Sequence, residues 1–113
     1  MFLFNIKAKP KADNPMAKTH GGAYVHCLID FVQQEGAEHL ARYYLEQDGW
    51  QALETEEVRI IERSDYEDDL KYLQYFNEAE EDGCSFIYYG YPPPRKRRVI
   101  TRSTPVTRRK KPR

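Results

Sequence analysis

Long hydrophobic runs are missing from the 113-residue sequence, and cysteine is scarce. No apolar stretch approaches the roughly 20 residues that a membrane-spanning helix needs. The N-terminus, MFLFNIKAKPK, has no basic region before its apolar residues and no small-residue cleavage site after them, so it does not resemble a signal peptide. We therefore expect a cytoplasmic protein with no membrane span, in which the thiols stay reduced.

Motifs that carry known chemistry are also missing. Cys27 and Cys84 form no C-x-x-C pair, which leaves neither a zinc pattern nor a disulfide framework. Gly21-Gly22 lacks the rest of a phosphate-binding loop, and neither G-x-S-x-G nor H-E-x-x-H occurs. His26 precedes Cys27 in a predicted strand, so the two side chains point to opposite faces and cannot share one metal ion. We expect no metal, no cofactor and no enzymatic activity.

Acidic residues are absent from the last 19 positions, although the formal net charge of the whole chain is zero. Positions 1–94 contain all 18 acidic residues and eight basic ones, a net charge of −10. The other ten basic residues are Arg95, Lys96, Arg97, Arg98, Arg102, Arg108, Arg109, Lys110, Lys111 and Arg113. We therefore predict an acidic domain over residues 1–91 and a basic, largely disordered tail over residues 92–113 that serves in binding.

Four segments have the composition of strands. Residues 2–9 alternate between apolar and polar side chains, which predicts a strand with one buried face. Residues 23–32 are almost continuously apolar and predict a central strand, and residues 84–91 predict another strand. Residues 58–63 form a short β-branched run, whereas the sequence QALETEE before it is ambiguous.

Two segments have helical periodicity. In residues 36–48, apolar side chains recur at helical spacing, and Gly49 provides a C-terminal stop. Trp50 should fold back onto this helix. A second helix should start at a cap formed by Ser64 or Asp65 and end at Gly83.

The resulting order, β-β-α-β-α-β, predicts an α+β fold. Each helix joins two strands through a connection long enough for a right-handed crossover, so we expect a two-layer sandwich with both helices on one face of a four-stranded sheet. This is similar to the ferredoxin-like class by analogy only, with one strand displaced, and the analogy implies no function. The predicted core consists of Phe4, Val25, Ile29, Leu40, Leu45, Leu73, Phe76 and Phe86.

Helices on one face would leave the other face of the sheet uncovered. By strand alternation, this face should carry Tyr24, His26, Leu28, Tyr89 and Tyr91, a set rich in aromatic side chains. Such a surface suits base stacking or dimerisation. We favour a homodimer, because a body with a charge of −10 repels phosphate.

The basic tail is the strongest functional feature of the sequence. Ten positive charges can neutralise phosphates and release counterions, or they can contact anionic lipid, act as a localisation signal or fold back on the acidic body. We interpret the chain as a non-enzymatic binding protein, in which the acidic domain self-associates or docks a protein partner and the tail attaches electrostatically to RNA or DNA. The alternative is a protein-interaction or inhibitory module that uses its acidic helical surface, with an autoinhibitory or solubilising tail.

Overall fold

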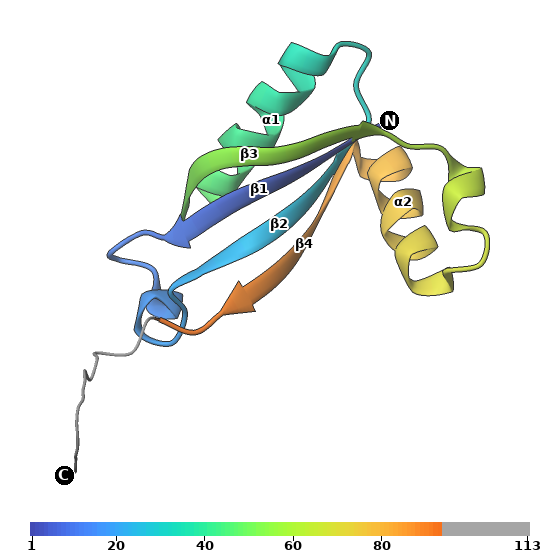
Figure 1. The fold of residues 1–113 in the computed structure, drawn as a ribbon. Coiled ribbons are helices and arrows are strands. Elements are labelled where there is room, and N and C mark those ends of the chain that lie inside the picture. The colour runs from blue at the N-terminus through green and yellow to red at the C-terminus, as the bar shows by residue number, and fades with distance from the viewer. Residues whose placement is uncertain (94–113) are drawn as a thin grey trace, which may run out of the picture.

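A computed structural model describes residues 1–93 of the chain (Figure 1). Its four strands are β1 (Phe2–Pro10), β2 (Gly22–Ile29), β3 (Trp50–Ile60) and β4 (Cys84–Tyr91). Its two helices are α1 (Gln34–Gln47) and α2 (Leu70–Asp82), and two short 3-10 helices are η1 (Pro15–Lys18) and η2 (Arg63–Tyr66). The predicted order and the α+β class are confirmed.

The strands form one antiparallel sheet in the order β3-β1-β2-β4. β1 and β2 are central, whereas β3 and β4 are the two edges. β3 starts at Trp50, eight residues before its predicted start, and therefore includes the ambiguous QALETEE segment. β2 ends at Ile29, short of the predicted end at residue 32, and the next residue, Asp30, donates its backbone N–H to the carbonyl of Gly83.

Glycines in the left-handed conformation end both helices. Gly49 has φ of 88° after α1, and Gly83 has φ of 91° after α2, as predicted for C-terminal stops. At the start of α2, the Asp69 carboxylate accepts a hydrogen bond from the backbone N–H of Tyr72 at 3.0 Å. The predicted caps in residues 64–65 lie instead in η2, so α2 begins later than expected.

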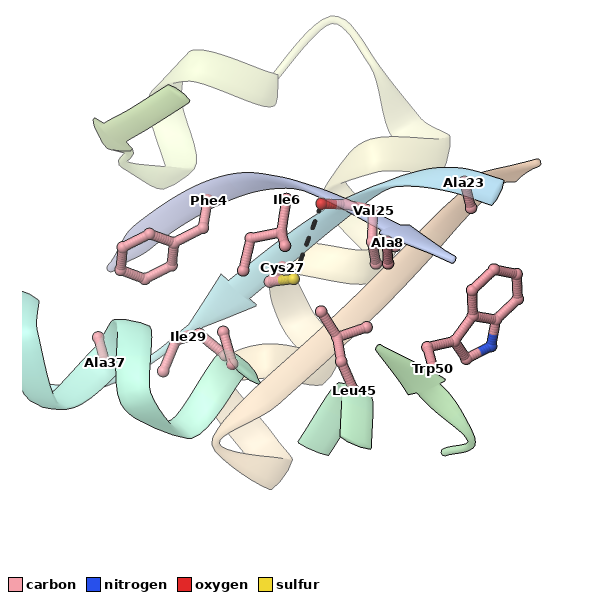
Figure 2. Close-up of a cluster of buried hydrophobic side chains, with 11 residues drawn as sticks. Phe4, Ile6, Ala8, Ala23, Val25, Cys27, Ile29, Ala37, Leu45 and Trp50 are labelled. Atoms are coloured by element: carbon pink, nitrogen blue, oxygen red, sulfur yellow. Dashed lines mark hydrogen bonds between the residues drawn. The ribbon is translucent and has the colours of Figure 1, made fainter. Parts of the chain in front are cut away.

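α1 covers one face of the sheet and forms the two layers of the sandwich with it (Figures 1 and 2). Leu45 of α1 and Trp50 pack against inward-facing strand side chains such as Val25. Trp50 thus folds back towards the helix as expected. Burial confirms five of the eight predicted core residues, Phe4, Val25, Ile29, Leu45 and Phe76, whereas Leu40, Leu73 and Phe86 are only partly buried.

α2 packs on the opposite face, so the expectation that both helices share one face is wrong. Phe76 of α2 lies in a second buried cluster with Leu3, Leu28 and Ile87. Leu3 precedes Phe4 of the α1 cluster, and adjacent strand residues point to opposite faces. The reason is topological: β3 and β4 run antiparallel, so the connection through α2 begins and ends at the same end of the sheet and needs no crossover.

Neither helix among the described residues has the length and apolar character needed to cross a membrane.

Candidate interaction surface

α2 covers only one end of the second sheet face. Under it, Leu28 is completely buried, so the prediction that Leu28 belongs to an exposed interface is wrong. The other end of the face carries the remaining predicted interface residues, which we call the tyrosine surface: Tyr24, His26, Tyr89 and Tyr91.

The strand register brings these four side chains together. Tyr24 of β2 lies opposite Tyr89 of β4, and His26 lies opposite Ile87. The rings of Tyr24 and Tyr91 are 5.6 Å apart, and the rings of His26 and Tyr89 meet edge to face at 4.9 Å. Tyr24 is 40% exposed and Tyr89 is 49% exposed, so the surface can contact a partner.

Two tyrosines of α2 extend this surface, and sequence reasoning did not place them there. The Tyr72 hydroxyl lies 3.2 Å from Nδ1 of His26, and the Tyr72 ring stacks on Tyr66 at 4.4 Å. Tyr75 meets Tyr72 edge to face. The helical periodicity assigns Tyr72 to the buried side of α2, but it does not reveal which face of the sheet that side meets.

A pocket of about 300 Å³ lies between α2 and β4. Its lining residues are Asp69, Lys71, Tyr72, Tyr75, Ile87, Tyr88 and Tyr89. The side chain of Tyr88 points to the α1 face, where its hydroxyl donates to the Asp48 carboxylate at 3.0 Å and its ring meets Trp50. The pocket therefore borders three consecutive residues of β4, Ile87, Tyr88 and Tyr89.

The environment of the histidine and tyrosine side chains favours neutral groups. Burial lowers the pKa of His26 below its usual value, and the positive charge of Arg59 adds to this effect, while Glu57 opposes it. Burial also raises the pKa of the Tyr72 hydroxyl. At neutral pH the pair is therefore an uncharged hydrogen bond.

Cys27 is buried, and burial raises its thiol pKa, which disfavours the nucleophilic thiolate. Residues 1–93 contain no group of three or more His, Cys, Asp or Glu side chains arranged to hold a metal ion.

The two edge strands differ in their readiness to pair with another strand. β3 has two register shifts against β1, and it carries Glu54, Glu56, Glu57 and Arg59. Bulges and charged side chains are the usual protection of an edge strand. β4, with the sequence CSFIYYGY, has no charged residue, no proline and no register shift against β2. Within the part of the chain that the structure describes, its outer edge pairs with no strand.

The charges of the body are segregated along the sheet. The charged side chains of the half nearer α2 come from residues 30–42 and 56–82, with 14 acidic and four basic ones, a net charge of −10. We call this half the acidic end. The half at the other end of the strands has four acidic residues and four lysines, Lys7, Lys9, Lys11 and Lys18, and is neutral in sum. We call it the tail end, because β4 ends there at Tyr91 (Figure 1).

The ten predicted nucleic-acid-binding residues lie outside the described residues. The last described residue, Pro93, lies against Gly21 at the tail end. No family model matches the chain, and no curated protein or solved structure matches it either.

Proposed function

We propose that this chain is a non-enzymatic, cytoplasmic binding protein that attaches to nucleic acid electrostatically through its basic tail and docks a protein partner through its folded body. The observation that supports the proposal is the charge segregation along the sheet. A uniformly acidic body would repel a polyanion from the tail, but the body is neutral where the tail begins.

The size of the separation makes this arrangement effective. β4 has eight residues and spans about 26 Å at about 3.3 Å per residue. The Debye length at physiological ionic strength is about 8 Å, so charges at the acidic end are screened over roughly three Debye lengths from the start of the tail. A phosphate backbone at the tail end therefore meets the lysines and the tail before it meets the carboxylates.

The test is the salt dependence of binding by the full chain. We would measure the fluorescence anisotropy of labelled single-stranded and duplex oligonucleotides from low to physiological salt. Each phosphate neutralised should contribute a slope of about −0.9 for duplex DNA, or about −0.7 for a single strand, in a plot of log affinity against log salt. A full-length variant with all ten tail basic residues changed to Gln should lose the affinity and the steep slope.

A matched control changes basic residues at the acidic end. Arg63→Gln and Lys71→Gln remove positive charges from the half nearer α2 and should leave the affinity within about twofold, since they contact no phosphate in the proposed mode. Equal binding by the wild type and the neutralised-tail variant would contradict the proposal.

A second function has its own supporting observation. Residues 56–82, which include α2, contain 11 acidic side chains, and such a surface suits a basic protein partner, as expected for an inhibitory module. Under this alternative, a basic peptide such as oligolysine binds the full chain, and Glu78→Gln with Glu81→Gln weakens that binding. The neutralised-tail variant would then bind the peptide at least as well as the wild type.

A further inference from the structure

We propose that the protein partner of the body is a second copy of this chain, docked antiparallel along the outer edge of β4 so that the two sheets become one continuous sheet. This inference names the docking partner of the proposed function but rests on none of its nucleic-acid part. Three independent features of the described residues support it: the state of the edge, the pocket beside it and the distribution of charge.

The two edge strands differ in regularity and charge, and this difference favours β4 as the interface. An edge strand offers unpaired backbone N–H and C=O groups, and proteins block edges that must stay single. β3 is blocked by two register shifts and four charged side chains, whereas β4 is uncharged and regular along all eight residues. The chain thus protects one edge and leaves the other ready for strand addition.

The pocket borders the middle of β4, the strand with which the second copy would pair. In an antiparallel pair, directly opposed residues have their side chains on the same face of the sheet. The two-fold axis that relates the two copies is perpendicular to the sheet, so it must pass beside one residue of β4, which then lies opposite the same residue of the second copy. With the axis at Tyr88, Ile87 lies opposite Tyr89 of the second copy, and Ser85 lies opposite its Tyr91. These two tyrosines then enter the space beside α2, where Tyr72 and Tyr75 line the pocket together with Ile87.

Charge sets the direction of the pairing. β4 runs from the acidic end to the tail end, so an antiparallel partner places its tail end beside the acidic end of the first copy. The four lysines of each copy's tail end then lie beside the net charge of −10 at the other copy's acidic end. A parallel pair would bring the two acidic ends together, and like charges in contact disfavour association.

Sedimentation of the full chain tests the interface. The wild type should sediment as a dimer of a 13.4 kDa chain at micromolar concentration, and Tyr89→Lys should sediment as a monomer, because a lysine at the new strand pair cannot be buried. The matched control is Tyr43→Lys on α1, since Tyr43 is 52% exposed and lies on the other side of the molecule from the tyrosine surface. This control should stay dimeric.

Cross-linking tests the register. Opposed residues in an antiparallel pair have Cα atoms about 4.5–5.5 Å apart, within the range of a disulfide. In the Cys84→Ser background, Tyr88→Cys should give a covalent dimer under mild oxidation, and Tyr43→Cys should not. Circular dichroism of both variants checks that they fold.

Several outcomes would overturn the inference. A monomeric wild type, or a Tyr89→Lys variant that remains dimeric, removes β4 as the interface. Equal cross-linking of Tyr88→Cys and Tyr43→Cys indicates random collision between molecules and would also remove β4 as the interface. A monomeric wild type whose oligonucleotide affinity falls with Tyr89→Lys would assign the tyrosine surface to base stacking instead. Loss of salt-dependent binding with an intact dimer would remove the proposed function alone.

Discussion

The hydroxyl of Tyr72 on α2 lies 3.2 Å from Nδ1 of His26 on β2, which joins the second helix to the centre of the second sheet face. Both partners are partly buried, and the bond spans 46 positions of the sequence. It is a polar contact that accompanies the apolar packing of Phe76 on Leu28 and Ile87. Because burial lowers the pKa of His26, the stability of the domain also depends on the protonation of this histidine.

The first prediction is a loss of stability in mildly acidic solution. The folded-state pKa of His26 is below its usual value of 6.5, so as the pH falls the unfolded chain takes up this proton first. The free energy of unfolding should therefore have its full value above pH 6.5 and decrease as the pH falls from 6.5 towards the lowered pKa of His26. Urea midpoints at pH 7.5 and pH 5.5 measure this difference.

A histidine substitution isolates the group responsible. His26→Gln should flatten the change in urea midpoint between pH 7.5 and pH 5.5, because the glutamine does not titrate. His39→Gln on α1, where the side chain is exposed, serves as the control and should keep the wild-type change. An unchanged pH profile in His26→Gln would show that other groups cause the acid sensitivity.

The second prediction concerns the other partner of the hydrogen bond. Tyr72→Phe keeps the ring that stacks on Tyr66 and removes only the hydroxyl, so it should lower the free energy of unfolding by about 0.5–1.5 kcal/mol. Tyr75→Phe, one turn later, removes a hydroxyl that makes no hydrogen bond within residues 1–93 and should be nearly neutral. Denaturation in urea compares the two variants, and equal midpoints would contradict the role of the bond.

The third prediction ranks three leucines by burial. Leu45 is completely buried against the sheet, so Leu45→Ala should cost about 2–5 kcal/mol. Leu40 and Leu73 are only partly buried, and their alanine variants should cost clearly less than Leu45→Ala. Chemical denaturation of the three variants gives the order. A cost for Leu73→Ala equal to that for Leu45→Ala would contradict it.

The strand pattern predicts much of this fold. Residues 84–91 form a strand with the predicted bounds, and residues 2–9 form one that is a single residue longer, because their alternation matches two clearly different faces. The strand predicted over residues 58–63 overlaps β3 only at its last three residues. The alternation is hidden because two register shifts each insert an extra residue, Leu53 and Glu56, and every insertion inverts the alternation that follows.

The face chosen by α2 could not be predicted from periodicity. A helical pattern shows which side of a helix is apolar, but the direction of β3 relative to β4 decides whether the connection must cross the sheet. That direction follows from the pairing of β1 with both β2 and β3, which is not encoded in any one segment. For the same reason, the sequence pattern predicts all four residues of the tyrosine surface but not the contribution of Tyr72. It also assigns Leu28 to that surface, which is wrong because α2 covers Leu28.

The fourth prediction concerns the end of α2. Gly83 has φ of 91°, and a Cβ atom added there meets no atom within 4 Å, so the only penalty of a substitution is backbone strain. Gly83→Ala should therefore destabilise the domain by about 1–2 kcal/mol, whereas Gly83→Asn should cost less, since asparagine tolerates the left-handed region. Thermal unfolding compares them, and equal melting temperatures would show that the helix end relaxes to another conformation.

The irregular pairing of β3 also limits how far a strand-mediated assembly can grow. A sheet with two open edges can add subunits without end, as fibrils do, and each added chain presents a fresh edge for the next. Here the inserted residues Leu53 and Glu56 interrupt the regular backbone of β3, one of the two edge strands of the sheet. Addition at β4 therefore consumes the single open edge that residues 1–93 present, and assembly stops at a pair.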